Sequence, residues 1–307
     1  MTISSRPLSP ADVGLVLEIA SAAADADGVA PLSEDALLQV RHGSTAPARD
    51  LVSSGPWPGQ GPVGYAHLDA PDDAGQDGDV TAELVIHPAH RRRGHGTELL
   101  ASVLEAADGH GVRAWAHGDL PGTAALAATF GMTRIRALFQ LRMSLSELPA
   151  VDPVFPAGVT VRTFVPGADE TAWLEVNKRA FAHHPEQGSW TAKDLQLRED
   201  EPWFDPNGFF LAERDGRMAG FHWTKVHRPD DGARPIGEVY VVGVDPGQQG
   251  GGLGRALTQT GLAYLRRLGL AEVMLYVDED NPAAVKMYTA LGFTRWSTDV
   301  MYRHPGK

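Results

Sequence analysis

Two glycine-rich turns are the parts of this sequence whose residue types best suit the binding of an anion. The first turn is Arg91–Gly96 (Arg-Arg-Arg-Gly-His-Gly) and the second is Gln249–Gly254 (Gln-Gly-Gly-Gly-Leu-Gly). Each follows a strand-like run and precedes a helix-like run, so that small residues let the chain wrap closely and the first N–H groups of the helix have no partner within it. A diphosphate fits such a turn. Either turn alone is explained equally well as a plain strand–helix connection.

Two side chains near the second turn have the chemistry for proton transfer. Glu238 begins an apolar, β-branched run that ends at Val244, and Tyr288 lies in a helix-like run from Pro282 to Leu291. A carboxylate can take a proton from an attacking amine, and a phenol can give one to a leaving group. The residue types alone leave both roles open, because an acid at a strand end is usually solvated and a helical tyrosine usually packs in the core.

The turns belong to a repeat that covers most of the chain. Three glycines of the first half have counterparts in the second half, 156, 158 and 161 residues later: Gly64 and Gly220, Gly96 and Gly254, and Gly131 and Gly292. Three matches in the same order indicate a duplication. We therefore expect one domain at 1–148, a linker at 149–158, where three prolines discourage regular structure, and a second domain at 159–307.

The hydrophobic pattern places these motifs on definite elements. In the second half we expect strands at 160–164, 209–213, 217–225, 238–244 and 272–277 and helices at 253–268 and 282–291; in the first half, a weaker strand begins at Ile3. Gly59–Gly64 matches the letters G-x-G-x-x-G, but it contains Pro62 and runs into a strand, so it is interpreted as a hairpin loop.

Composition excludes several classes of function. The chain has 39 acidic and 27 basic residues, a net charge of −12, which argues against nucleic-acid and anionic-membrane partners. It has no cysteine, no apolar stretch long enough for a membrane span and no leader-like start, so we expect a cytoplasmic protein. The pairs His87/His90 and His183/His184 lack a third ligand, so no metal is expected.

A longer motif identifies a family. The second turn has the spacing Q-x-x-G-x-G, and the residues after it have the spacing N-x-x-A-x-x-x-Y-x-x-x-G-F, at Gln249, Gly252, Gly254, Asn281, Ala284, Tyr288, Gly292 and Phe293. In this the chain resembles the GCN5-related N-acetyltransferase family. The resemblance implies an α/β (α+β) fold with two tandem domains, each a mixed, mainly antiparallel sheet flanked by helices. It also implies acetyl-CoA as co-substrate, Glu238 as general base and Tyr288 as general acid.

The same resemblance assigns the coenzyme site. The strand before the turn is expected to splay from its neighbour and bond the pantetheine arm through its backbone, while the turn holds the diphosphate. In the second half the implied residues are Val242, Gly243, Val244, Gln249, Gly250, Gly251, Gly252, Leu253, Gly254, Arg255, Asn281, Pro282, Ala283, Ala284, Val285 and Lys286. In the first half they are Leu84, Val85, Ile86, Arg91, Arg92, Arg93, Gly94, His95 and Gly96.

Segments outside the coenzyme motif resemble a tandem-domain subgroup of that family. They are Asp27–Pro31, Trp115–Gly118, His184–Gly188, Trp203–Pro206 and Gly220–Lys225. This subgroup acetylates the cysteinyl amine of cysteinyl-glucosaminyl-inositol, and the resemblance implies that Glu34, Glu186, Lys225, Glu238 and Tyr276 hold this substrate. Two alternatives stay open: a tandem acetyltransferase of another amine, such as an aminoglycoside or a peptide N-terminus, and a non-catalytic acetyl-CoA sensor.

The first half is expected to bind acetyl-CoA without transferring its acetyl group. It keeps the coenzyme strand and the glycine turn. If this turn still binds acetyl-CoA, each domain binds one molecule of it. At the separations of the repeat, Glu238 falls on Val80 and Tyr288 on Ala127, and neither residue can move a proton. We expect a monomer whose second half performs the chemistry.

Overall fold

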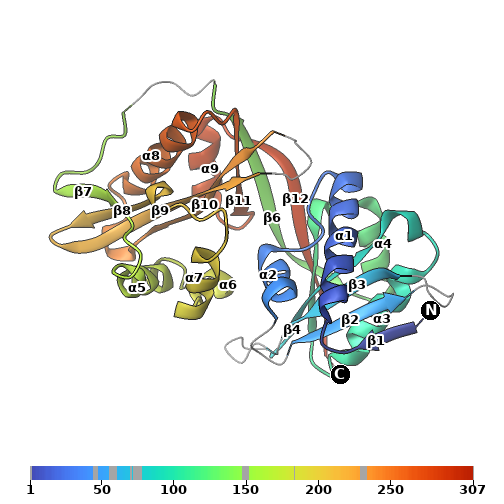
Figure 1. The fold of residues 1–307 in the computed structure, drawn as a ribbon. Coiled ribbons are helices and arrows are strands. Elements are labelled where there is room, and N and C mark those ends of the chain that lie inside the picture. Colours follow the sequence, from blue (N-terminus) through green and yellow to red (C-terminus); the bar gives the residue numbers. More distant parts are fainter. Residues whose placement is uncertain are drawn as a thin grey trace. The chain divides into compact units, whose positions relative to one another are not determined.

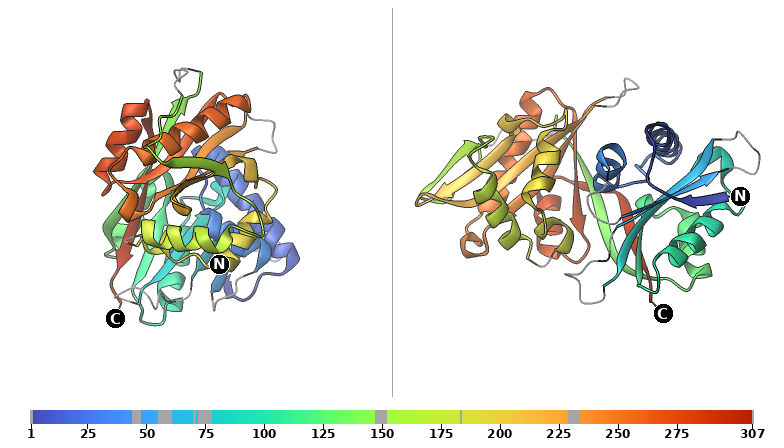
Figure 2. Two further views of the ribbon diagram at one scale, coloured as in Figure 1. Left: turned by 90° about the vertical axis from the view of Figure 1, so that its left-hand side faces the viewer. Right: turned by 60° about the horizontal axis from the view of Figure 1, so that its bottom comes forward.

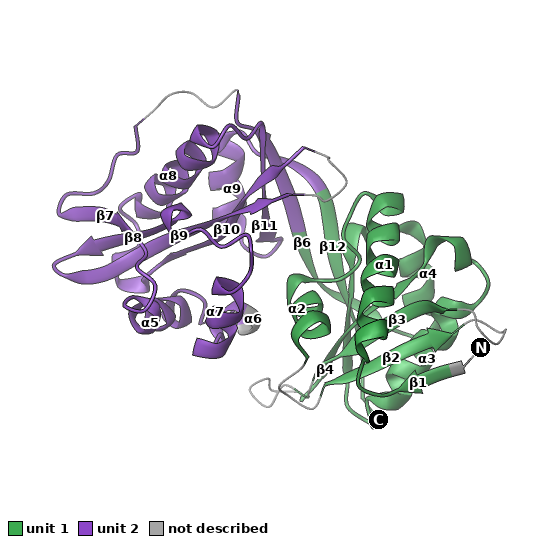
Figure 3. Cartoon of the chain, in the orientation of Figure 1, with its two compact units in different colours: residues 1–138, 297–307 green, residues 139–296 purple. Residues whose placement is uncertain are grey.

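The fold consists of two compact units, shown in Figures 1 and 3. The structure is a computed structural model that describes residues 2–43, 48–54, 61–69, 71, 78–146, 152–182, 184–228 and 234–306 of the chain. Unit 1 consists of Met1–Leu138 and Ser297–Lys307, and unit 2 of Phe139–Trp296. Residues 152–158, within the expected linker, form no helix or strand, and 147–151 lie outside the described residues.

Unit 1 is a mixed sheet covered by helices on both faces. Its strands follow the order β1-β2-β3-β4-β5-β12; β4 and β5 are parallel, and the pairs β1–β2, β2–β3, β3–β4 and β5–β12 are antiparallel. Its elements are β1 (Thr2–Ser5), α1 (Pro10–Asp27), α2 (Glu34–His42), β2 (Arg49–Ser54), β3 (Pro62–Leu68), β4 (Val80–Ile86), η1 (Pro88–His90), α3 (His95–Ala106), β5 (Val112–Ala116), η2 (His117–Asp119) and α4 (Pro121–Thr129).

Unit 2 repeats this plan with the strand order β6-β11-β10-β9-β8-β7, in which β10 and β11 are parallel. Its elements are β7 (Val159–Thr163), α5 (Glu170–Ala180), α6 (Pro185–Gly188), α7 (Ala192–Glu199), η3 (Pro206–Gly208), β8 (Phe209–Arg214), β9 (Arg217–His227), β10 (Ile236–Val244), η4 (Pro246–Gln248), α8 (Leu253–Arg267), β11 (Glu272–Asp278) and α9 (Pro282–Leu291). The expected α/β fold with two similar regions, each a mixed sheet flanked by helices, is therefore confirmed, and the expected helix at 282–291 is α9 with the same bounds.

The last strand of each half joins the unit built by the other half. Strand β6 (Thr133–Ser144) contributes its residues from Phe139 onward to unit 2, and β12 (Thr294–His304) contributes its residues from Ser297 onward to unit 1. The compact units thus differ from the expected division into 1–148 and 159–307. The physical reason is that pairing of a terminal strand depends on which sheet edge it meets, and the local sequence does not specify that edge.

Contacts within unit 1 hold β12 in place. Residues Val300–His304 pair antiparallel with Ala116–Val112 of β5. The guanidinium of Arg303 donates to the buried Asp79 carboxylate at 2.6 Å, and Asp299 accepts from the backbone N–H of Gly118 at 2.8 Å. The buried Asp79 therefore depends on β12 for its nearest cation, and β12 itself carries the second buried carboxylate, Asp299.

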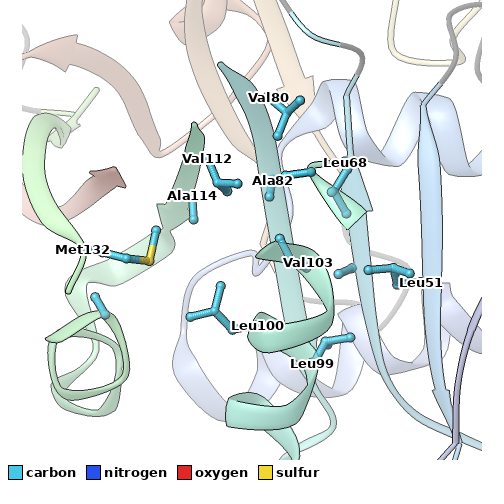
Figure 4. Close-up of a cluster of buried hydrophobic side chains, with 13 residues drawn as sticks. Leu51, Leu68, Val80, Ala82, Leu99, Leu100, Val103, Val112, Ala114 and Met132 are labelled. Carbon is cyan, nitrogen blue, oxygen red and sulfur yellow. The ribbon is translucent and has the colours of Figure 1, made fainter. Parts of the chain in front are cut away.

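Alternating apolar residues give each sheet two buried faces. In unit 1, Leu51 and Ala66 pack with α3 in the cluster of Figure 4, whereas their neighbours Val52 and Tyr65 pack with α1 on the opposite face. The right-hand view of Figure 2 shows the blue helices α1 and α2 and the green helices α3 and α4 on opposite sides of these strands. Such two-sided burial is typical of a layered α/β domain.

Candidate functional site

Strand β10 separates from β11 directly after Glu238. The two strands pair in parallel at Gly237 with Val273 and at Glu238 with Met274, and beyond these pairs they diverge, although β10 stays paired with β9 as far as Val244. In unit 1, β4 and β5 pair only from Val80 to Ala82 and then diverge in the same way. Each divergence exposes the strand edge that the family resemblance assigns to the coenzyme.

A β-bulge at Tyr240 changes the alternation of side chains in β10 just after Glu238. Val239 lies opposite Thr224 and Val241 lies opposite Trp223, so Tyr240 is the extra residue. A bulge reverses the alternation of side chains along a strand. Val239 accordingly packs with α8, while Val241 packs on the face of α5.

The bulge corrects one correspondence between the two halves. Strand β4 has no bulge between Ala82 and Ile86, so its residues before Ala82 shift by one relative to β10. The counterpart of Glu238 is therefore Thr81 and not Val80. Threonine is not a proton acceptor for an amine, so this position of unit 1 has no carboxylate like the one expected to act as base at Glu238.

Glu238 is buried beside two basic side chains of β9. Its side chain is 8% exposed, and its Oε2 lies 2.7 Å from Nε2 of His227, whose side chain is 33% exposed. Lys225 lies directly opposite on β9. The arrangement pairs a buried carboxylate with a partly exposed imidazole.

Lys225 is held by aromatic rings. Its ammonium lies 4.3 Å from the ring centre of Trp203 and 5.1 Å from that of Tyr240, and the residue is 7% exposed. Cation–π attraction of this kind offsets part of the cost of burying the charge. The hydroxyl of Tyr240 accepts from Nε of the buried Arg198 at 2.8 Å. The bulge, which turns Tyr240 to this face, thereby builds the surroundings of Lys225.

Tyr288 lies in α9 and packs edge-on against Phe293, with ring centres 5.7 Å apart. Burial raises the pKa of Tyr288 to about 12, so the hydroxyl stays protonated at any physiological pH. The backbone carbonyl of Tyr288 accepts from the N–H of Phe293, as the carbonyl of Ala127 accepts from the N–H of Met132. Ala127 is therefore the structural counterpart of Tyr288, as the repeat predicts.

The glycine turn of unit 2 has the geometry expected of an anion site. Gly250 and Gly252 have φ of 93° and 82°, which glycine adopts without strain, and Gly252 is the residue before α8. Nε2 of Gln249 donates to the carbonyl of Val244 at 3.4 Å, which folds the turn back onto the end of β10. Asn281 has a helix-capping role, because its Oδ1 accepts from the N–H of Ala284 at 3.1 Å.

The turn of unit 1 has the same shape with charged residues. Nε of Arg91, the counterpart of Gln249, donates to the carbonyl of Ile86 at 3.0 Å, and its guanidinium forms a two-bond ion pair with Asp27 at 2.6 and 2.7 Å. Arg92 has φ of 62° where the second turn has Gly250. A non-glycine residue in this conformation is strained by ~1–2 kcal/mol, so the turn keeps its second arginine at a cost in stability.

A cavity of about 480 Å³ lies in the divergence between β4 and β5 of unit 1. Its lining includes Leu84, Val85, Ile86, Arg91, Arg92, Gly96, Trp115, His117, Thr123, Ala127 and Tyr302. Six of these are residues that the resemblance assigns to the coenzyme. The small Ala127 at the place of a tyrosine leaves room in the cavity and puts no phenol there.

His117, a largely buried histidine to which the sequence assigned no role of its own, also lines this cavity. Nδ1 of His117 lies 2.9 Å from Asp299, and Nε2 lies 3.5 Å from Glu83. Burial alone lowers the pKa of His117, but the contacts with the two carboxylates together raise it to about 10. Glu83 also accepts from the N–H of Ser33 at 2.5 Å, which is the residue before α2.

The remaining predicted substrate residues lie on several elements. Tyr276 is two residues beyond Met274 on β11, on the face of Glu238, and its hydroxyl accepts from Gln140 at 2.7 Å. Glu34 is the first residue of α2 in unit 1. Glu186 is in α6, but its side chain lies outside the described residues. His227 was also missed; its signal in the sequence is its place two residues after Lys225, on the same face of one strand.

Two searches of the described residues bear on other functions. Within them, no three His, Asp or Glu side chains gather as a metal site would require. No described helix has the length and apolar character needed to cross a membrane.

Comparison with known proteins decides the family. A model of the acetyltransferase (GNAT) family matches residues 33–132 and 172–293, one region in each half of the chain. The chain belongs to this family. It is an acetyl-CoA-dependent N-acetyltransferase, and the resemblance noted in the sequence is confirmed.

Relatives of this GNAT protein match along its whole length. It is 58% identical to a protein of Thermobispora bispora over 96% of this chain and 97% of the relative, and 57% identical to one of Thermomonospora curvata over 99% and 97%. Both relatives are named mycothiol acetyltransferase. A tandem GNAT protein from the clavulanic acid biosynthesis pathway has the same fold, with a TM-score of 0.73 and 24% identity over 99% of this chain and 98% of that one.

Proposed function

We propose that the protein transfers acetyl from acetyl-CoA to the cysteinyl amine of cysteinyl-glucosaminyl-inositol, which yields mycothiol. The observation that carries this proposal is the 58% identity, over nearly the full length of both chains, to a mycothiol acetyltransferase. A tandem GNAT protein from another pathway, that of clavulanic acid, shares the fold, and fold alone does not specify a substrate. The proposal therefore rests on sequence identity for the substrate and on the site for the mechanism.

Unit 2 performs the chemistry in this proposal, with Glu238 as the base. The amine attacks the thioester carbonyl directly, and its proton passes to the carboxylate, either directly or through one water. An α-amino group has a reference pKa of ~7.7–8, so a substantial share is already neutral near pH 7 and a strongly perturbed base is not required. The burial of Glu238 beside Lys225 supports a role at the reacting amine.

The backbone of β10 from Val242 to Val244 faces the divergence from β11 and polarises the thioester carbonyl. The turn from Gln249 to Arg255 holds the diphosphate at the start of α8, where unpaired N–H groups favour an anion. Acetyl-CoA supplies the acetyl group when it is bound; the chain orients it and moves the protons.

Tyr288 protonates the departing thiolate. The pKa of Tyr288 is about 12 and that of a thiol is ~8.5, so this proton transfer is uphill by ~5 kcal/mol. That cost is small compared with an uncatalysed acyl-transfer barrier. Burial also keeps water away from the sulfur. No covalent intermediate on the enzyme is needed.

Unit 1 binds acetyl-CoA and does not transfer it. Its cavity and its turn support binding, because Arg91 and Arg92 both line the space where the coenzyme would lie. Thr81 and Ala127 at the places of Glu238 and Tyr288 support the absence of transfer. Bound coenzyme then stabilises the unit by linkage.

Lys225, Glu186 and Tyr276 of unit 2, with Glu34 of unit 1, bind the sugar–inositol part of the substrate. A polyhydroxylated ligand needs several donors and acceptors, and charged groups form the stronger bonds. We further propose a monomeric, cytoplasmic protein that uses no metal.

An amine panel tests the proposed substrate. Purified protein and acetyl-CoA are incubated with cysteinyl-glucosaminyl-inositol, an aminoglycoside and a cysteinyl peptide, and products are identified by mass spectrometry. We expect acetylation of the cysteinyl amine of the first compound. Faster turnover of another amine under matched conditions contradicts the substrate, and binding of acetyl-CoA with no turnover of any amine supports a sensor instead.

A further inference from the structure

We infer that His227 is a positioning residue for the base: its Nε2–H donates to Oε2 of Glu238 and leaves Oε1 for the proton of the amine. This rests on the proposed function, in which Glu238 is the proton acceptor. The two atoms are 2.7 Å apart, a distance typical of a charge-assisted hydrogen bond. Within the described part of the chain, no other hydrogen bond to the Glu238 carboxylate is recorded.

The register of the sheet brings these two side chains together. Lys225 lies directly opposite Glu238, and His227 lies opposite Ile236, so His227 is the diagonal neighbour of Glu238 on the same face. Diagonal neighbours in an antiparallel pair are within reach of long side chains. Because Lys225 turns its ammonium to the rings of Trp203 and Tyr240, the imidazole is the donor that meets the carboxylate.

A carboxylate on a strand needs such a partner to act as a base. Glutamate loses much rotamer freedom when it is fixed, and a misplacement of about 1 Å at a reacting centre can lower a rate by ~10²-fold. A hydrogen bond to one oxygen fixes the plane of the carboxylate and so directs the other oxygen.

The burial of the pair agrees with this role. The Glu238 side chain is 8% exposed, while His227 is 33% exposed and lies near the end of β9. The imidazole therefore covers one oxygen of the base from solvent without closing the site.

Kinetics of four variants and one control test the inference. His227→Ala removes the donor, His227→Gln keeps an N–H donor, and Glu238→Gln removes the base, alone and combined with His227→Ala. Arg228→Gln is the control, because it removes the cation of the exposed neighbouring residue. Melting temperature and acetyl-CoA affinity, measured for every variant, show whether it is folded.

We expect His227→Ala to lower kcat by ~10- to 100-fold with little change in KM, because orientation of the base and not binding is lost. His227→Gln should recover much of that loss, and Arg228→Gln should keep wild-type kcat. In the Glu238→Gln background His227→Ala should have almost no further effect, since residues that act as a unit are non-additive.

Several results would overturn the inference. They are wild-type kcat in His227→Ala, an equal loss in His227→Gln, or a full additional loss in the Glu238→Gln background. If Glu238→Gln itself loses kcat, each of these results overturns the role of His227 but leaves Glu238 as the base. Wild-type kcat in Glu238→Gln instead overturns the base, and the inference with it.

Discussion

Ala127 of unit 1 occupies the place that Tyr288 occupies in unit 2. Both lie in the helix after the second parallel strand, and both accept a hydrogen bond on the carbonyl from the residue five positions later, Met132 or Phe293. One half of a duplicated fold thus has a phenol where the other has a methyl group. Unit 1 has a cavity beside Ala127, whereas unit 2 has, at this place, the tyrosine that we propose as the acid.

The proposed proton-transfer groups of unit 2 give the first prediction. Glu238→Gln and Tyr288→Phe should each lower kcat by ~10²–10⁴-fold, the usual contribution of a general base or acid. The affinity for acetyl-CoA should stay near wild type, because neither side chain is assigned to coenzyme recognition. Steady-state kinetics and calorimetry check this, with Glu272→Gln, an exposed residue of β11, as control. Unchanged kcat in the double variant would remove both groups from the mechanism.

The cavity of unit 1 gives the second prediction. Ala127→Tyr should reduce the number of acetyl-CoA molecules bound from two to one, because the new ring fills space beside Leu84 and Met132. Ala128→Tyr is the matched control, since Ala128 is exposed on the same helix. Titration calorimetry measures the stoichiometry. Two molecules bound to Ala127→Tyr, or one bound to the wild type, contradicts a coenzyme site in unit 1.

The strained arginine gives the third prediction. Arg92→Gly should stabilise unit 1 by ~1 kcal/mol, because glycine adopts a positive φ without strain. The same change should weaken acetyl-CoA binding to unit 1, because it removes one guanidinium from the cavity wall. Gly250→Ala is the opposite test and should destabilise unit 2 by ~1 kcal/mol or more. A variant Arg92→Gly that binds the coenzyme as tightly as wild type shows that the strain serves another purpose.

Three buried histidines give opposite pH dependences of stability to the two units. In unit 1, carboxylate contacts outweigh burial and raise the pKa to about 10 for His117 and about 9 for His67. In unit 2, burial lowers the pKa of His222 to about 4. A raised folded-state pKa contributes stability that is fully present below the unfolded value of ~6.5 and is lost as pH rises through 9–10. A lowered one contributes stability that is lost as pH falls from ~6.5 to 4.

Hydrogen exchange followed by unit measures this fourth prediction. Protection in unit 1 should fall between pH 7 and 10, and protection in unit 2 should fall between pH 6 and 4. His117→Gln should flatten the alkaline loss in unit 1 and leave unit 2 unchanged. The same pH dependence in both units would show that these histidines do not control it.

The exchange of terminal strands gives the fifth prediction. Deletion of residues 297–307 should destabilise unit 1 more than unit 2, although the deleted segment follows unit 2 in the sequence. The deletion leaves Asp79, which is 3% exposed, without Arg303 and leaves His117 without Asp299. Loss of a partner from a buried charge costs several kcal/mol. Exchange in β5 should rise, whereas deletion of 305–307 alone should have little effect; a loss confined to unit 2 contradicts the strand exchange.

The sequence by itself determined the family, the repeat and the places of the two turns. These features are local: a glycine turn between a strand and a helix has its geometry written in a few consecutive residues, as Gly250 and Gly252 show by their positive φ. For the same reason a run of β-branched and aromatic residues located β10, apolar periodicity located α8, and a proline start with a glycine end located α9. The spacing also predicted the counterpart of Tyr288, because the separation of 161 residues that relates Gly131 to Gly292 also relates Ala127 to Tyr288.

Tertiary structure decided the features that depend on which strands meet. The bulge at Tyr240 shifted the counterpart of Glu238 from Val80 to Thr81, because only the opposite strand reveals an extra residue. Likewise, only cross-strand register brings His227 to Glu238. The exchange of β6 and β12 comes from long-range pairing at a sheet edge, which no local pattern of side chains encodes.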